Sequence, residues 1–169
     1  GLTQSNIPVG SWRAHLSFKT VKHLAQGDNK IFAASANAVL VYDFDDGGFS
    51  SYSTLDALST TDISAINYDG TRKQLIVAYE NGALDFIREN SVLTYTRLVN
   101  PSGVLVSPGI NHILIDGGIA YLSTDYGVVL FDLDKNEVRE TWRNLGRTGQ
   151  LIGVNQTVRQ GGSVYLAST

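Results

Sequence analysis

The amino-acid sequence predicts an all-β fold made of a repeated four-stranded unit, and three observations lead to this prediction. An internal repeat returns every 44 or 45 residues along the 169-residue chain. Turn-forming glycines, aspartates and asparagines separate short apolar runs of strand length. No sustained helical periodicity accompanies them, so the repeat unit consists of strands and turns.

The repeat is clearest in segments 30–42, 74–86 and 119–131, which align without gaps. Each segment contains an apolar strand, a short polar turn and a second apolar strand that ends in an aromatic residue. A fourth, shorter copy follows at 163–169. The third residue of each first strand marks the register, at separations of 44, 45 and 44 residues: Phe32, Ile76, Tyr121 and Tyr165.

One period contains four antiparallel strands joined by tight turns. In the second copy, the strands are expected at 63–68, 75–79, 83–88 and 93–98. Polar residues and glycines between them supply the positive backbone φ angles that hairpin turns require. The turn sequences of this copy are Asp69-Gly70, Glu80-Asn81-Gly82 and Glu89-Asn90.

Continuous apolar runs, as at 75–78 and 128–131, indicate strands that are buried on both faces. A sheet stacked between two neighbours provides that environment, whereas a sandwich strand with one wet face alternates. Together with a period of about 40–50 residues per four strands, this favours a β-propeller of four-stranded antiparallel blades. Aromatic residues that end the aligned segments are expected to fill the wider side of each wedge-shaped blade: Tyr42, Phe86 and Phe131.

The propeller is expected to be incomplete, with about three and a half blades in this chain. The expected blades are 21–62, 63–109, 110–153 and 154–169, and residues 1–20 form an N-terminal segment that could complete a blade. Closed propellers contain roughly four to eight blades. We therefore expect the chain to self-associate through its open blade edges.

Composition excludes several partners. The net charge of −3 gives no basic surface for phosphates, so nucleic acid is not expected to bind. The chain has no cysteine and no apolar run of the roughly 20 residues that a membrane-spanning helix needs. It also has no methionine, even at position 1, so we expect that a secretory signal was removed and that the protein is secreted to the periplasm or cell surface.

The repeat resembles the blade of the two-component-regulator propeller family. The matching motifs are Ala57-Leu58-Ser59, Ile63-Ser64-Ala65-Ile66, Asp69-Gly70, Tyr42-Asp43 and Phe131-Asp132. Alanines stand where that family has glycines at Ala38 and Ala57. The segment 10–18 before the first blade looks more particularly like the start of PorZ-type proteins of the type IX secretion system.

This resemblance implies a non-enzymatic, secreted recognition scaffold in type IX secretion or cell-envelope assembly. Its implied partners are other protein components or envelope glycan and lipopolysaccharide. The alternative is the periplasmic glycan-sensing propeller of a hybrid two-component sensor kinase. Neither role follows from the periodicity or the composition.

Catalytic motifs are absent: the sequence has no Gly-x-Ser-x-Gly elbow, no P-loop and no His-Glu-x-x-His, so no enzyme, catalytic residue or cofactor is expected. Ligand contacts are expected instead on the loops between second and third strands, which share a face with the links between blades. The candidate rim residues are Asn37, Glu80, Asn81, Asp125 and Tyr126.

Three further groups have both a functional and a structural interpretation. His23 and His112 fall on inner strands, as a ligand or proton-sensing pair or, as we favour, as partly buried histidines. The segment 132–137 spaces its oxygens like a calcium loop but lacks the glycine and distal glutamate of an EF-hand, so a hairpin turn and no metal site is expected. Trp12 and Trp142 could stack on a sugar, although packing inside the protein is favoured.

Overall fold

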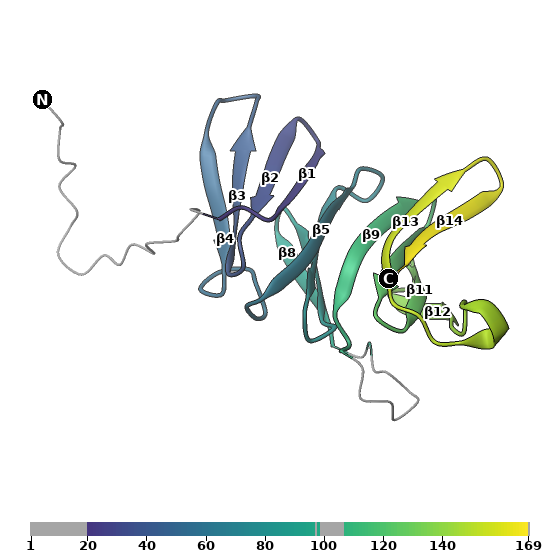
Figure 1. Cartoon of the computed structure of the whole chain (residues 1–169). Coiled ribbons are helices and arrows are strands. Elements are labelled where there is room, and N and C mark those ends of the chain that lie inside the picture. Colours follow the sequence, from purple (N-terminus) through teal and green to yellow (C-terminus); the bar gives the residue numbers. More distant parts are fainter. Residues whose placement is uncertain (1–19, 97, 99–106, 169) are drawn as a thin grey trace, which may run out of the picture.

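The computed structural model describes residues 20–96, 98 and 107–168 and confirms the all-β propeller architecture. Three four-stranded antiparallel sheets and one two-stranded sheet stack side by side as an open arc (Figure 1). These are three complete blades and half of a fourth. Residues 1–19, which include most of the predicted N-terminal segment, its PorZ-like sequence and Trp12, lie outside the described residues.

Each blade uses consecutive strands. Blade one contains β1 (His23–Gly27), β2 (Lys30–Ala34), β3 (Ala38–Asp43) and β4 (Phe49–Ser53). Blade two contains β5 (Ile63–Asp69), β6 (Gln74–Tyr79), β7 (Leu84–Arg88) and β8 (Ser91–Tyr95). Blade three contains β9 (Ile110–Asp116), β10 (Ile119–Thr124), β11 (Gly127–Asp132) and β12 (Glu137–Trp142). A short 3₁₀ turn, η1 (Arg147–Gly149), precedes the half blade of β13 (Val154–Gln160) and β14 (Ser163–Ser168).

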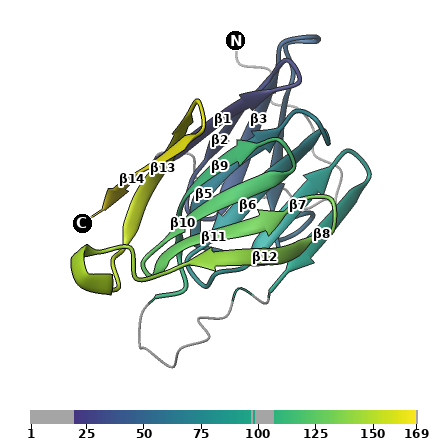
Figure 2. The ribbon, with the colours of Figure 1, turned by 90° about the vertical axis from the view of Figure 1, so that its right-hand side faces the viewer.

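The first strand of each blade lies on the inner side of the arc. Within every sheet the strands follow chain order, so β1, β5, β9 and β13 are neighbours and the fourth strands lie outermost. Figure 2 looks onto blade three, with blades two and one stacked behind it. The loops between second and third strands therefore share one face with the links between blades, and the other hairpin turns share the opposite face.

Apolar side chains fill the boundaries between blades. Phe32, Ile76 and Tyr121 each point toward the following blade and are 2%, 0% and 8% exposed. Tyr165 occupies the same place in the half blade but is 56% exposed, because no described residue packs over that face. The repeat register read from the sequence is therefore the register of the packed core in the three complete blades.

The alignment is wrong by one residue in the third strand of blade two. The hairpin loop there has three residues, 80–82, whereas the corresponding loops of blades one and three have two. One extra residue turns every following side chain to the opposite face of the sheet. Phe86 consequently faces blade three, whereas Phe131 faces blade two and Tyr42 lies on the open face of blade one. The three aromatic residues do not fill equivalent sides of their blades.

Polar contacts connect the blades as well. On the face of the first hairpin turns, an ion pair crosses each boundary: Lys73 with Asp28, Arg72 with Asp134, and Arg159 with Asp116. Deeper in the boundary, the hydroxyls of Ser123 and Thr157 lie 2.7 Å apart between blade three and the half blade. These contacts fix the rotation of one blade against the next.

Candidate functional site

The rim candidates are spread over the face of the blade links. Asn37 and Glu80 are exposed on the loops of blades one and two. Asn81 is exposed too, and its Oδ1 accepts a hydrogen bond of 2.9 Å from the backbone N–H of Ala83, which closes the turn. The three side chains belong to two adjacent loops, but they line neither of the two pockets described below.

The other two rim candidates are bound into the fold. The Asp125 carboxylate accepts a hydrogen bond of 2.9 Å from Asn111 Nδ2, which also donates to the Val154 carbonyl at 3.0 Å and so joins blade three to the half blade. Tyr126 is only 2% exposed, with the Arg143 guanidinium 5.7 Å from its ring centre. Burial raises the pKa of the Tyr126 hydroxyl. Its aromatic face is therefore in the core and does not reach the solvent.

The two inner-strand histidines line a common pocket. His23 on β1 and His112 on β9 belong to a cavity of about 300 Å³ on the inner side of blades one to three. Burial lowers the pKa of both imidazoles, and the neighbouring Lys22 lowers that of His23 further. Both rings are consequently neutral near pH 7. Their positions on inner strands agree with the sequence prediction, and their partial burial agrees with the structural interpretation of these histidines.

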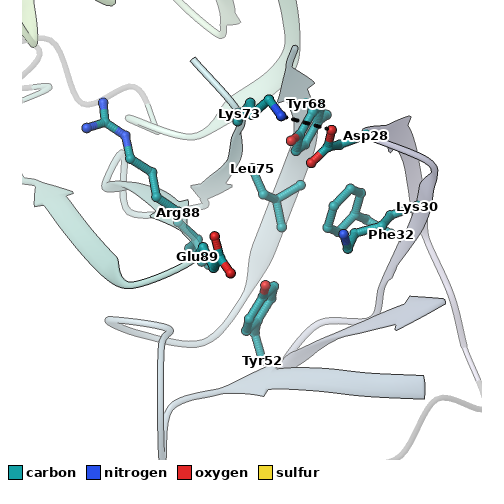
Figure 3. A pocket seen from close by; sticks show the side chains of 10 residues that line it. Asp28, Lys30, Phe32, Tyr52, Tyr68, Lys73, Leu75, Arg88 and Glu89 are labelled. Atoms are coloured by element: carbon teal, nitrogen blue, oxygen red, sulfur yellow. Dashed lines mark ion pairs between the residues drawn. The ribbon is translucent and has the colours of Figure 1, made fainter. Parts of the chain in front are cut away.

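A larger pocket opens on the opposite face from the rim, between blades one and two. This interblade pocket has a volume of about 460 Å³ (Figure 3). Its floor is apolar, formed by Phe32, Leu75 and Ile87. The remaining lining residues are polar or aromatic: Asp28, Lys30, Tyr52, Tyr68, Lys73, Arg88 and Glu89.

The charges around the interblade pocket are mostly paired. Lys30 Nζ lies 3.0 Å from Asp43 Oδ2, and Lys73 Nζ lies 3.6 Å from Asp28 Oδ1. The guanidinium of Arg88 is directed away from the pocket in Figure 3, and its Nε donates to Gln74 Oε1 at 3.0 Å. The pocket therefore presents charges of both signs without a strong excess of either.

Two tyrosines form the walls of the interblade pocket. Tyr52 comes from β4 of blade one and Tyr68 from β5 of blade two. The ring of Tyr68 stacks on that of Phe32, with centroids 5.3 Å apart and an interplanar angle of 14°. Gly27 makes this possible, because a β-carbon at that position would overlap the Tyr68 ring. Burial raises the pKa of both tyrosine hydroxyls, which stay protonated and able to donate.

Sequence reasoning missed the interblade pocket. Its lining comes from turns and strand ends between Asp28 and Glu89, and only the stacking of two blades brings them together. The available sign was that Tyr52 lies near the end of the outer strand of blade one and Tyr68 near the end of the inner strand of blade two, where a charged turn follows Tyr68. That pattern becomes informative only once the blades are known to be neighbours.

The calcium-like segment forms a hairpin turn, as predicted. Asp132 Oδ1 accepts hydrogen bonds of 3.0 Å from the backbone N–H groups of Asp134 and Lys135. Asp43, at the same position of blade one, accepts one of 2.9 Å from Asp45. Among the described residues, no group of three or more histidine or acidic side chains is placed to hold a metal ion.

Trp142 packs within the fold. The indole of Trp142 lies beside Tyr121, with ring centroids 5.8 Å apart, in the boundary between blade three and the half blade. This agrees with the packing interpretation that the sequence favoured.

Blades of four antiparallel strands, stacked with their first strands innermost, define the chain as a β-propeller. The chain belongs to the family described as the N-terminal β-propeller domain of PorZ, of the type IX secretion system, whose model matches residues 31–169. The match covers the half blade and all of the three complete blades except β1 and the first residue of β2.

Similar solved structures support the same fold. PorZ from Porphyromonas gingivalis, described as an essential bacterial surface component of the type IX secretion system, matches with a TM-score of 0.66 and 21% identity over 78% of this chain. The extracellular domain of the hybrid two-component system BT4673 from B. thetaiotaomicron matches with a TM-score of 0.70 and 15% identity over 93% of this chain. BamB from Moraxella catarrhalis matches with a TM-score of 0.63 and 15% identity over 88%.

The chain spans only part of each of these proteins: 17% of PorZ, 21% of the BT4673 domain and 47% of BamB. No curated protein matches its sequence. Within the part of the chain that the structure describes, no helix has the length and apolar character required to span a membrane.

Proposed function

We propose that this chain is a non-enzymatic recognition scaffold outside the cytoplasm, of the PorZ type, acting in type IX secretion or cell-envelope assembly. The observation that carries the proposal is the match of the PorZ propeller family across residues 31–169. The similar PorZ structure is described as a bacterial surface component, and the BT4673 structure as an extracellular domain. Both descriptions support secretion to the periplasm or cell surface.

The architecture suits binding more than catalysis. Sheets that stack on one another and are joined across every described boundary support the loops, and such loops commonly carry binding residues. We propose Asn37, Glu80, Asn81 and Asp125 as contacts for a protein component or an envelope glycan such as lipopolysaccharide. The burial of Tyr126 argues that this residue supports its loop from below and does not touch the ligand.

The open faces of the first and last blades support self-association. Leu24 and Phe49 are 69% and 70% exposed on blade one, and Val158 and Tyr165 are 48% and 56% exposed on the half blade. Leu24 corresponds to Ile66 and Ile113, which the preceding blades cover. A second copy of the chain would therefore continue an interface that the fold already repeats. Replacing Leu24 and Tyr165 by serine is expected to lower the molar mass measured by light scattering to that of one chain; unchanged mass would reject this contact.

The secretion role is tested by deleting the gene in its host and restoring it with wild type, Asn81→Ala or Asp125→Ala. We expect the deletion to abolish surface attachment of type IX cargo and the rim variants to restore it only in part. Full secretion without the gene would reject the role. The alternative, a glycan-sensing propeller of a hybrid two-component system, is favoured by the BT4673 match and predicts instead a lost transcriptional response to an oligosaccharide.

A further inference from the structure

We propose that the interblade pocket between blades one and two binds a neutral saccharide unit. The inference rests on the proposed recognition role, but it places a ligand on the face opposite the rim, at polar and aromatic residues that the family motifs do not single out. It follows from the shape of the pocket, its aromatic walls and its balance of charge.

The pocket has the size and construction of a small-molecule site. Its volume of about 460 Å³ lies inside the range of roughly 300 to 1,000 Å³ that such sites occupy. The floor residues Phe32, Leu75 and Ile87 are 2%, 2% and 4% exposed, so the concave surface is formed by well-packed core side chains. Polar groups stand around this apolar floor, which is the usual arrangement of a ligand pocket.

Aromatic walls suit the apolar face of a sugar ring. Tyr52 and Tyr68 are both half-buried and belong to different blades, so they border the cavity from two sides (Figure 3). The stacking of Tyr68 on Phe32 holds its ring in place. A saccharide presents C–H groups on one face and hydroxyls around its edge, and rigid aromatic rings with a polar tip match that combination.

The charged groups select a polyol over an ion. Lys73 and Asp28 form a loose ion pair, and Lys30 is neutralised by Asp43, so their remaining capacity is for hydrogen bonding. Glu89 is exposed at the edge of the pocket with two acceptor oxygens. A phosphate would meet Glu89 and Asp28, and an ammonium group would meet Lys30 and Lys73. Sugar hydroxyls both donate and accept, and therefore use both kinds of group.

The test is saturation-transfer NMR on the 169-residue chain with maltose, cellobiose, lactose and mannobiose as neutral probes, and with glucuronate and inorganic phosphate as charged probes. We expect at least one neutral disaccharide to receive saturation, strongest on its ring C–H protons. Tyr52→Leu removes an aromatic wall and Glu89→Gln removes a charged acceptor; each is expected to weaken binding by about fivefold or more. The matched control is Glu137→Gln, an exposed glutamate at the corresponding turn of blade three, which should bind as wild type.

Three results would overturn the inference: no transfer to any neutral disaccharide from a chain whose circular dichroism shows it folded, equal binding by the pocket variants and the control, or tighter binding of glucuronate or phosphate. Asn81→Ala separates the two proposals, because this rim variant should keep saccharide binding. A variant that loses secretion in cells but still binds saccharide would support the pocket proposal and not the link to secretion. A variant that keeps secretion but loses saccharide binding would support the secretion role alone.

Discussion

Phe86 and Phe131 stack across the boundary between blades two and three, with ring centroids 5.4 Å apart and an interplanar angle of 22°. The two residues occupy the same position of the sequence repeat, yet they face each other. Tyr95 adds an edge-to-face contact with Phe131 at 5.0 Å. The extra loop residue in blade two creates this cluster. It turns Phe86 toward blade three, and Phe131 of blade three faces blade two.

Removing one ring of this cluster should be costly. Phe131 is 0% exposed, so Phe131→Ala is expected to lower the free energy of unfolding by about 3 to 5 kcal/mol. The control is Phe49→Ala on the open face of blade one, where the ring is 70% exposed and a change within about 0.5 kcal/mol is expected. Urea denaturation followed by circular dichroism measures both values. Similar losses for the two variants would contradict the assigned boundary.

Gly127 should tolerate no side chain. Its φ angle is +126°, and a β-carbon there would overlap the carbonyl oxygen of Trp142 on the neighbouring strand. Gly127→Ala is therefore expected to destabilise the chain by more than about 2 kcal/mol. Gly70→Ala, at a turn where a β-carbon meets open space, is the matched control and should change the thermal midpoint little. A well-tolerated Gly127→Ala would show that this hairpin is built differently.

Asp85 is expected to hold the link between blades one and two. Its buried carboxylate accepts hydrogen bonds from the Ser59 N–H at 2.7 Å, the Tyr79 hydroxyl at 2.6 Å and the Thr94 hydroxyl at 2.6 Å. Burial, together with this carboxylate, raises the pKa of Tyr79. Asp85→Asn places an amide N–H₂ among these donors and should cost about 2 to 4 kcal/mol.

Limited proteolysis provides a second measurement for Asp85→Asn. Cleavage within 54–62 should accelerate, because the link loses the bond from Ser59. Glu140→Gln, an exposed change on β12, is the control. If the link is cut no faster in the Asp85 variant, the carboxylate does not anchor it.

His23 and His112 should make stability depend on pH. Their pKa values in the folded chain lie below the ordinary 6.5, so the unfolded chain binds protons more readily once the pH falls below about 6.5. Stability is therefore full above that value and is lost as the pH drops toward the folded pKa values. The His23→Asn, His112→Asn double variant should show a flatter urea midpoint between about pH 7.5 and 5 than wild type. Parallel curves would argue against the burial of these rings.

The sequence predicted the order of stacking and placed the first three strands of blade two within one residue at each end. The fourth strand was expected at 93–98 but spans Ser91–Tyr95, because the two-residue turn Glu89-Asn90 lets the strand begin directly after it.

Phe32, Ile76 and Tyr121 recur at a nearly constant spacing because each is covered by the next blade. The sequence period therefore reflects a packing requirement. The extra residue in the loop of blade two cannot be recognised in the sequence alignment. Gly82 still aligns with Gly127, and an aromatic residue still ends the segment. Periodicity records which positions are buried more reliably than which face they bury.

The candidate sites were less predictable, for two physical reasons. Tyr126 reads as a loop residue, but its loop has only two residues and its ring turns into the blade boundary. The interblade pocket joins Asp28, Tyr52 and Glu89 from three separate turns and strand ends, and these meet only in three dimensions. Local sequence patterns place loops on a face, but the packing of neighbouring blades decides which side chains reach solvent.

In each complete blade, the third residue of the second strand lies beneath the next blade, whereas Tyr165 of the half blade is exposed. Because the chain has no native cysteine, single cysteines at Ile76, Tyr121 and Tyr165 can be labelled with a thiol reagent without interference. In dilute solution, Tyr165→Cys should react freely, while Ile76→Cys and Tyr121→Cys should be protected by at least about a hundredfold. Equal labelling rates at the three positions would show that the blades do not stack as described.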